Sequence, residues 1–574
     1  RDAITWSFDL LSDDERDGLR LFAVFSDARL TDVEEIAQRI PELGGLDIVD
    51  ALGSLVDKSM VRSSQGLDGR PRFSMLQTIR GYATEQLDAM PELADAARRA
   101  HAEHYTELAA GLYKQLTFAG RGEFLAAFSV ELANVRAAWD EWAGRADIGR
   151  LNDLLAPLWG YYDARGEYRS AIELGNDLLE CLAVTPDTPE RRRDEFVVRM
   201  NLVRTELAVR GFTTEAEQLI REALDRAASA EDDRQRFPGL RSLAYLHMMR
   251  ADMAKMGAVA GELMVIAEQD HDPLLLSQAH LLTGLSRAWL DDLPSSLDHY
   301  DQAVKQFAAT RSGHIDFRIG PNPGVVANVV TGLTQWMVGC PESASSAMQQ
   351  ALDLAAGLNH PFSTAYALHH AGLLDLWRQD LTGVGARADD LLAIAEAHDY
   401  ATWRALALVW GGMAMVGSGD VDAGLARVEE GFELYKGLSA PPVFWPALLM
   451  IRASALGLAG RGEEGLALIE EAKAALEAGD PMGPDVGIVH GELLLALTPP
   501  DVAAADAEFQ RAAALATDRG ARMAQLQALT HLAVLRRGAP SEAEATRALQ
   551  DVYDGFTEGL DSPHLVAARA ALAR

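Results

Sequence analysis

The chain has 574 residues, of which 48% are hydrophobic and 24% charged, an ordinary composition for a folded protein that excludes intrinsic disorder. Its formal net charge of -33 disfavours nucleic acid as a partner, because phosphates are repelled unless one face is locally basic. Only Cys181 and Cys340 occur, so neither a disulfide framework nor a cysteine metal site is indicated. No apolar run is long enough to cross a bilayer, and we expect a cytoplasmic protein without a membrane partner.

The first 90 residues predict helices followed by one hairpin. Ser12 lies three residues before Glu15, which is capping-box spacing for a helix N-terminus. This order of elements predicts a winged-helix domain over residues 1–90. The expected elements are helices over residues 5–25, from Thr31 and over 48–56, strands over 58–62 and 72–76 around a turn at 66–69, and a helix from Gln77.

A winged helix often binds DNA, but the charge of this segment argues against it. Residues 1–90 contain 17 acidic and 10 basic residues, and the helix that would enter a groove, from Asp47 to Asp57, is itself acidic. A small basic edge on the hairpin is the best remaining argument for a nucleic-acid contact, although solvated arginines on a hairpin are the more usual explanation. The candidates for that contact are Arg62, Arg70 and Arg72.

Several segments resemble a known family. Residues 2–12 (DAITWSFDLLS), 55–61 (LVDKSMV) and 76–83 (LQTIRGYA) resemble the winged helix that follows the nucleotide-binding core in bacterial STAND signalling ATPases, a family that includes cyclase-linked and LuxR/AfsR-like transcriptional regulators. Later segments are similar to the same family, namely ELANVRAA at 131–138, NPGV at 322–325, HPFSTAYALH at 360–369, GELLL at 491–495 and YDGFTEG at 553–559.

The resemblance implies an effector domain, a P-loop ATPase core, the winged helix and tetratricopeptide-like repeats that sense an inducer. This chain lacks the phosphate-binding loop, since neither Gly44-Gly45 nor Gly411-Gly412 is followed by the required lysine and hydroxyl residue. We therefore predict no cofactor in this chain. Because the sequence starts at Arg1, we expect it to be part of a longer protein whose ATPase core and effector domain are its partners.

From about residue 150 onward, Ala- and Leu-rich helical segments are separated by short turns at intervals of roughly 40 residues. We expect residues 91–150 to be a helical linker and residues 151–574 to be a tetratricopeptide-like, right-handed α-solenoid, which makes the fold all-α. Such an array builds a binding groove more often than a catalytic pocket. The turns are predicted at 165–167, 210–212, 291–293, 339–341, 379–381, 418–420, 461–463, 499–501 and 538–540.

Aromatic and histidine side chains are the candidates for binding in the groove. The tryptophans before the turns either fill the gap between paired helices, which is the commoner role, or line the groove, and one residue of register decides between these roles. Neighbouring His369 and His370 point about 100° apart on a helix, so no shared metal site is predicted, and capping or packing is favoured for each histidine. The candidate ligand- or partner-binding residues are Trp289, Trp336, His360, Phe362, His369, Trp377, Trp403 and Trp445.

No pattern for nucleophilic or acid–base catalysis is present, and we predict that the chain is not an enzyme. The sequence favours a regulatory sensor segment of a multidomain signalling ATPase or transcriptional regulator, in which the repeat groove binds a small-molecule inducer or a partner protein. A constitutive protein–protein scaffold is the main alternative. A DNA-binding regulator that acts through the hairpin is the third.

Overall fold

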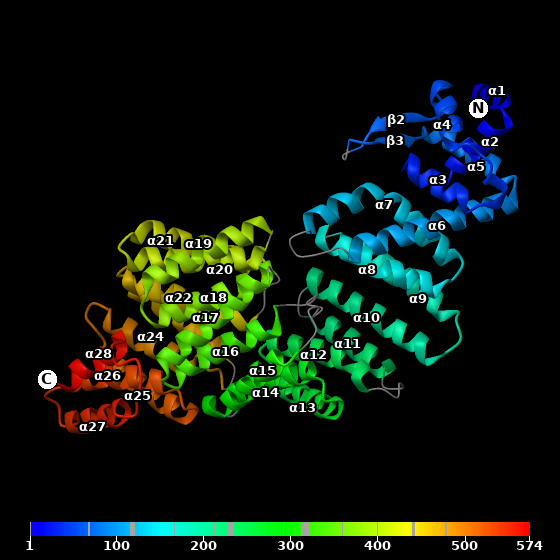
Figure 1. The fold of residues 1–574 in the computed structure, drawn as a ribbon. Coiled ribbons are helices and arrows are strands. Elements are labelled where there is room, and N and C mark those ends of the chain that lie inside the picture. Colours follow the sequence, from blue (N-terminus) through cyan, green and yellow to red (C-terminus); the bar gives the residue numbers. More distant parts are fainter. Residues whose placement is uncertain are drawn as a thin grey trace. The chain divides into compact units, whose positions relative to one another are not determined.

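The computed structural model describes residues 2–66, 69–114, 121–165, 167–210, 213–227, 233–290, 292–310, 321–358, 360–398, 400–438, 442–476 and 479–573. The chain forms two compact units, the N-terminal unit Arg1–Thr205 and the C-terminal unit Glu206–Arg574, whose elements are labelled in Figure 1. The fold is all-α apart from one small sheet. Divisions at residues 90 and 150, which the sequence predicts within the first unit, stay predictions. Among the described residues no helix is both long and apolar enough to cross a membrane.

The N-terminal unit begins with helices around a three-stranded antiparallel sheet in which β3 lies between β1 and β2. The capping box of Ser12 and Glu15 is confirmed, and it divides the predicted helix over residues 5–25 into α1 and α2. The elements are α1 (Asp2–Asp9), α2 (Asp13–Phe22), β1 (Asp27–Arg29), α3 (Leu30–Gln38), η1 (Pro41–Leu43), α4 (Ile48–Asp57), β2 (Arg62–Gln65), β3 (Pro71–Ser74) and α5 (Gln77–Asp88).

The predicted first strand at residues 58–62 is wrong by several positions. After α4 the chain turns at Ser59, whose φ of 58° is left-handed, and the amide of Met60 bonds back to the carbonyl of Leu55. The strand β2 can therefore start only at Arg62. The sequence analysis also missed β1, which has only three residues.

Long helices complete the N-terminal unit. One continuous hydrophobic core extends from Phe8 to Val198, so the sheet region and the helices after it share their buried side chains. These helices are α6 (Pro91–Lys114), α7 (Arg121–Gly144), α8 (Ile148–Arg165), α9 (Tyr168–Ala183) and α10 (Pro189–Arg210), the last of which crosses the division between the units.

The C-terminal unit is a succession of helical hairpins. Its elements are α11 (Thr214–Ala227), η2 (Asp233–Arg236), α12 (Phe237–Met249), α13 (Met253–Asp270), α14 (Pro273–Leu290), α15 (Leu293–Ala308), α16 (Pro323–Met337), α17 (Pro341–Gly357), α18 (Pro361–Trp377), α19 (Leu381–Ala397), α20 (Ala401–Gly417), α21 (Val421–Lys436), η3 (Pro442–Phe444), α22 (Trp445–Leu458), α23 (Gly462–Ala475), α24 (Gly483–Leu495), α25 (Val502–Arg519), α26 (Arg522–Leu535), α27 (Glu542–Tyr553) and α28 (Pro563–Leu572).

The hairpin turns share one backbone motif. In the turns after α16, α18 and α20, the amides of Cys340, Asp380 and Asp420 each bond to a carbonyl five residues earlier, and the residue before each amide has a positive φ. The predicted turns at 339–341, 379–381, 418–420, 461–463, 499–501 and 538–540 all separate described helices. Those at 165–167, 210–212 and 291–293 include residues outside the described ranges.

The hairpin turn between α12 and α13 was not predicted. Ala251 separates α12 from α13 with a φ of 60°, and the amide of Asp252 closes the same motif on the carbonyl of His247. Glycine is the usual residue at a positive φ, and alanine rarely adopts this conformation. The sequence therefore contains no signal for a turn at this position.

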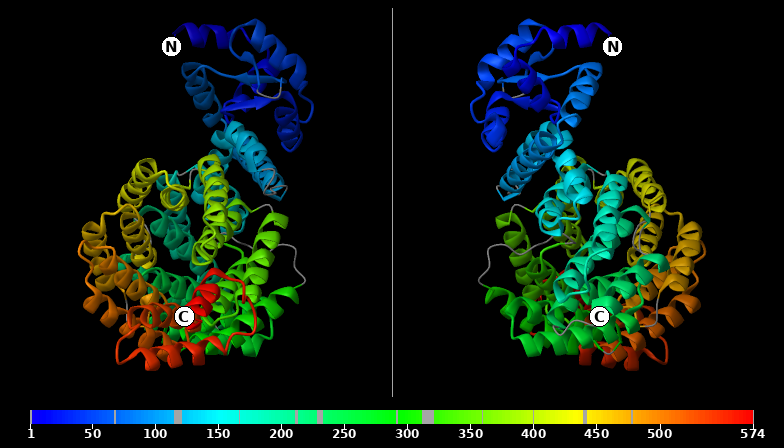
Figure 2. Two further views of the ribbon diagram at one scale, coloured as in Figure 1. Left: turned by 90° about the vertical axis from the view of Figure 1, so that its left-hand side faces the viewer. Right: turned by 90° about the vertical axis from the view of Figure 1, so that its right-hand side faces the viewer.

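The even-numbered helices from α16 to α26 form an inner row, in which each helix contacts the next and α26 contacts α16 again. The two ends of the row therefore meet, and in Figure 2 the green, yellow, orange and red helices of this unit surround a common centre. Residues 555–564, which we call the closing segment, help to join the ends. Glu558 accepts hydrogen bonds from the amides of Glu342 and Ser343 at 3.0 Å each, and the amide of Gly559 donates to the Glu342 carboxylate at 3.0 Å.

Candidate ligand cavity

A cavity of about 210 Å³ lies among the inner helices of the C-terminal unit. Its walls come from the ends of α14 and α16, the second half of α18, the middle of α20, the start of α22 with the preceding turn η3, and the turn before α24. Nearly all of the lining is apolar. The lining residues are Trp289, Leu333, Met337, His369, His370, Leu373, Trp377, Leu406, Trp410, Val443, Phe444, Pro446, Ala447, Leu448, Ile451, Asp480, Pro481 and Met482.

Helical spacing explains why these side chains converge. On α18 the cavity receives His369, Leu373 and Trp377, which are four residues apart and therefore share one helix face. The pair Leu406 and Trp410 shows the same spacing on α20. Most residues of these two helices are buried, as expected for helices enclosed by others, and α18 and α20 are each flanked by the outer helices of their hairpins.

The two histidines on α18 have defined tautomers. The indole N–H of Trp410 donates to Nδ1 of His369 at 2.9 Å, so this nitrogen has no proton and Nε2 of neutral His369 carries it. Nδ1 of His370 lies 2.8 Å from the backbone carbonyl of Tyr366, which can only accept, so His370 is protonated at Nδ1 and its Nε2 has a free lone pair. The pair thus offers one donor and one acceptor.

The surroundings of both histidines favour the neutral form. His369 is 4% exposed and His370 is 9% exposed. Burial lowers the pKa of His370 to about 4, and burial together with the neighbouring His370 lowers the pKa of His369 well below its ordinary value. Among the residues that the structure describes, no group hydrogen-bonds to Nε2 of either ring.

The wall around Trp289 is held by contacts from distant parts of the unit. Arg519 donates hydrogen bonds to the carbonyls of Ala288 and Gly479, the second at 2.8 Å. Gly479 has a φ of 84° and lies against the carbonyl of Trp289, where a Cβ would collide with it. Asp480 accepts from the amide of Met482 at 2.9 Å, and this bond shapes the turn that covers the cavity.

Three of the eight predicted binding residues line the cavity: Trp289, His369 and Trp377. Of the others, Trp403 lies behind the wall against the ring of His369, with a centroid distance of 5.5 Å, and Phe362 packs on Trp403. These placements give the aromatic side chains both of the predicted roles, packing and lining.

The remaining candidates lie outside the cavity. Trp336 is 2% exposed and contacts His564, His360 hydrogen-bonds Ser363 at the start of α18, and Trp445 packs on Phe432. No cluster of metal-ligating side chains occurs in the described parts of the chain. Sequence reasoning did not select Leu333, Met337, Val443 or residues 480–482, because isolated apolar residues and a short turn carry no binding signal.

Arg72 is not part of an exposed basic edge on the hairpin, contrary to the prediction. This side chain is only 5% exposed, and it forms ion pairs with Glu131 on α7 at 2.7 Å and with Asp27 on β1 at 2.8 Å. Desolvation by itself would lower the pKa of Arg72, but the hydrogen bonds to Glu131 and Asp27 raise it. The expectation of a solvated arginine at this position is therefore wrong. Arg62 and Arg70 are exposed, and a nucleic-acid contact through them stays a prediction.

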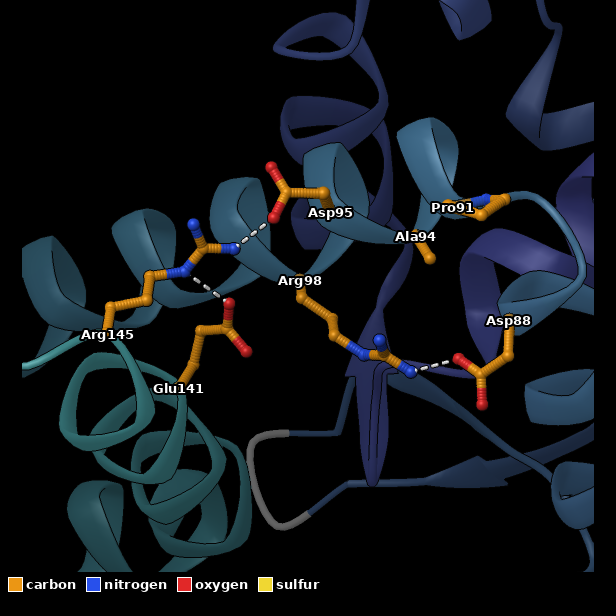
Figure 3. A pocket seen from close by; sticks show the side chains of 7 residues that line it. All are labelled: Asp88, Pro91, Ala94, Asp95, Arg98, Glu141 and Arg145. Atoms are coloured by element: carbon orange, nitrogen blue, oxygen red, sulfur yellow. Dashed lines mark hydrogen bonds and ion pairs between the residues drawn. The ribbon is translucent and has the colours of Figure 1, made fainter.

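A second hollow, of about 270 Å³, lies in the N-terminal unit between α5, α6 and α7. It is lined by Asp88, Pro91, Ala94, Asp95, Arg98, Glu141 and Arg145 (Figure 3). Its charges are already paired, since Arg98 bonds Asp88 and Arg145 bonds Asp95 at 2.5 Å and Glu141 at 2.6 Å. Although it is larger, this surface hollow offers a ligand less than the apolar cavity does.

Part of the chain is similar in sequence to a protein described as a transcriptional regulator. No protein-family model matches it. Over 184 residues, 31% of this chain, it is 33% identical to a Mycobacterium tuberculosis protein described as a "putative HTH-type transcriptional regulator", of which the match covers 20%. It is 26% identical over 192 residues to an uncharacterized protein of Rhizobium meliloti, covering 33% of this chain and 18% of that protein. The chain spans about a fifth of the length of these curated relatives.

Solved structures with similar helical arrays have low sequence identity. A STAND protein with a tetratricopeptide repeat sensor from Pyrococcus horikoshii is 14% identical, with a TM-score of 0.47, over 81% of this chain and 63% of that chain. A Rap protein complexed with Competence and Sporulation Factor is 12% identical, with a TM-score of 0.42, over 71% of this chain and 99% of that chain.

Proposed function

We propose that the chain is the sensor region of a transcriptional regulator of the STAND type, and that its inducer binds in the cavity of the C-terminal unit. The observation that carries the proposal is the cavity itself, which combines four aromatic side chains with two buried histidines whose Nε2 atoms are unpaired among the described residues. Pockets for small molecules commonly combine an apolar lining with a few polar groups in this way. The partial sequence likeness to a regulator supports the same reading.

The position of the cavity supports a mechanism by population shift. Trp377 lines the cavity, and its backbone carbonyl is 2.7 Å from Nε2 of His564 in the closing segment. The same histidine ring contacts Trp336. A ligand that changes the position of Trp377 would therefore alter the contacts that join the ends of the helical row. It can shift the equilibrium only by its difference in affinity for the joined and opened forms.

The N-terminal elements support a winged-helix assignment. After α1, their order is helix, strand, two helices and a hairpin, with β3 central in the sheet; this includes the helices and the hairpin expected from the sequence and adds β1. In our proposal this domain docks on an ATPase core supplied by the longer protein. DNA binding through the hairpin is not favoured, because Arg72 is occupied by Glu131 and Asp27.

The test is a thermal-shift screen of the 574-residue chain against small metabolites, since a ligand selective for the folded state raises the melting temperature. Hits are repeated with Ala447→Phe, which places a ring in the cavity, and with Ala474→Phe, which places one on the exposed side of α23. We expect saturable shifts that Ala447→Phe abolishes and Ala474→Phe retains, with altered hydrogen exchange in the closing segment. Shifts that survive Ala447→Phe, or no shift with any metabolite, would favour the protein scaffold instead.

A further inference from the structure

The two unpaired histidine nitrogens restrict what the cavity can bind. His369 and His370 are both more than nine-tenths buried and both line the cavity. Their rings are nearly perpendicular, at 89°, with centroids 4.7 Å apart. A ligand in the cavity can therefore form hydrogen bonds with both nitrogens.

The tautomers fix the polarity of those bonds. His369 presents an N–H because its Nδ1 accepts from Trp410, and His370 presents a lone pair because its Nδ1 donates to the carbonyl of Tyr366. A hydroxyl group satisfies both, since its oxygen accepts from one ring and its O–H donates to the other. A carboxylate could only accept, and an ammonium group could only donate.

The other lining residues favour an uncharged aromatic ligand. The rings of Trp289, Trp377, Trp410 and Phe444 offer faces and edges for aromatic contacts, and burying a charge without a counter-ion among them is costly. The acidic group in the lining, Asp480, is already engaged by the amide of Met482. An apolar cavity of about 150 Å³ can hold benzene. The present volume of about 210 Å³ therefore fits one ring with small substituents, or two fused rings.

We propose that the cavity binds an uncharged aromatic compound of one or two rings that carries a hydroxyl group, which accepts from Nε2 of His369 and donates to Nε2 of His370. This inference rests on the proposed sensor function, because it names the ligand class of the same cavity.

The probes are phenol and 4-methylphenol, with toluene as the match that lacks the hydroxyl and benzoate as the charged match. Binding to the full chain is measured by titration calorimetry and tryptophan fluorescence. We expect both phenols to saturate one site, toluene to bind at least tenfold more weakly, and benzoate not to bind. Ala447→Phe should abolish binding of the phenols, whereas Ala474→Phe should leave it unchanged.

The hydroxyl assignment is tested with His370→Phe, which removes the acceptor. Its matched control is His280→Phe, because His280 is half-buried against His299 and does not line the cavity. We expect His370→Phe to weaken phenol at least tenfold without weakening toluene, and His280→Phe to change neither. Should His370→Phe fail to fold, His369→Phe serves instead, because it removes the donor and should also weaken phenol without weakening toluene.

Equal affinities for phenol and toluene, tighter binding of benzoate, or no saturation by the phenols at concentrations on the order of 10 mM would each overturn the proposed ligand class. Failure of the proposed function is distinguishable from these results. If another metabolite stabilises the wild-type chain and Ala447→Phe abolishes the shift, the sensor proposal stands and the ligand class alone is wrong. If no metabolite does so, both are wrong.

Discussion

Each unit of the molecule contains a group of buried polar side chains, and the two groups differ in how they are paired. In the N-terminal unit, Arg72, Glu131 and Asn134 are almost fully buried, and every one of them binds a partner on another element. In the C-terminal unit, His369 and His370 are equally buried, but each has one nitrogen that no described residue binds.

In our proposal the two groups serve different purposes. Asn134 accepts from the amide of Ser26 and donates to the carbonyl of Asp27, both at 2.8 Å, so α7 holds the edge of β1 as a neighbouring strand would. A fully satisfied network of this kind fixes one arrangement of sheet and helix. The histidines leave hydrogen-bonding capacity unused in a cavity with aromatic walls, which is the arrangement that a ligand site requires.

The largest effect should follow from breaking the buried polar cluster of Arg72, Glu131 and Asn134. We expect Arg72→Ala to destabilise the N-terminal unit by about 2–4 kcal/mol, because Glu131 is 1% exposed and would lose both hydrogen bonds from Arg72, keeping the longer one from Arg29 at 3.3 Å. Hydrogen exchange of the β1 and β3 amides measures the loss locally. Arg62→Ala, at an exposed position on β2, should change it by less than about 0.5 kcal/mol. Equal effects of the two substitutions would mean that the cluster is not a structural anchor.

A smaller effect is expected at the helix that carries Trp410. A Cβ on Gly412 would lie 2.7 Å from the carbonyl oxygen of Gly424, so α20 and α21 can approach closely only without a side chain there. We expect Gly412→Ala to destabilise the C-terminal unit by about 1–3 kcal/mol in urea unfolding. Gly261→Ala, on α13 with open space around it, should instead be neutral or stabilise by up to about 1 kcal/mol. A Gly412→Ala variant as stable as Gly261→Ala would show that the close approach of α20 and α21 does not require glycine.

A third test concerns Asp485 on α24, whose neutral form the fold favours. Desolvation raises the pKa of Asp485 to about 7, with the nearby charge of Asp480 adding to the shift. Because the folded state holds this proton more tightly than the unfolded state, the contribution of Asp485 to stability is present below pH 4 and is lost as the pH rises from about 4 to 7.

We therefore expect Asp485→Asn to stabilise the chain at pH 8, by on the order of 1–2 kcal/mol once its partial exposure is considered. The gain should vanish near pH 4. Melting temperatures of both proteins across this pH range provide the measurement. A gain that is the same at pH 4 and pH 8 would show that removal of the charge is not its cause.

Sequence reasoning predicted the regular parts of the fold well. The capping signal at Ser12 located the start of α2, and glycines such as Gly339 and Gly419 marked hairpin turns. It failed where a residue adopts a conformation that its type rarely takes. The left-handed conformation of Ser59 moves the start of the hairpin's first strand to Arg62, and Ala251 forms a turn without a glycine. A local pattern cannot show that tertiary packing stabilises such a residue.

The candidate site was predictable only in part, for a related reason. The density of polar and aromatic residues on α18 drew attention to His369 and Trp377, and both line the cavity. The sequence could not show that Trp336 and Trp377, at equivalent places in successive hairpins, have different environments. That difference arises because the row of helices closes on itself and brings His564 against Trp336. Arg72 was misjudged similarly, since its partner Glu131 is 59 residues away in the chain.

The smallest expected effect distinguishes a ligand site from a packing defect. A cavity that is merely a defect and one that is kept open for binding both gain stability when filled, and we expect Ala447→Phe to stabilise the C-terminal unit by about 0.5–2 kcal/mol. The exposed control Ala474→Phe should be neutral within about 0.5 kcal/mol. The two cases differ in ligand binding, because only at a binding site does the stabilised variant also lose its ligand response. Urea unfolding and phenol titration of the same preparations give both quantities, and a variant that becomes more stable while binding phenol as tightly as the wild type would assign the cavity to imperfect packing.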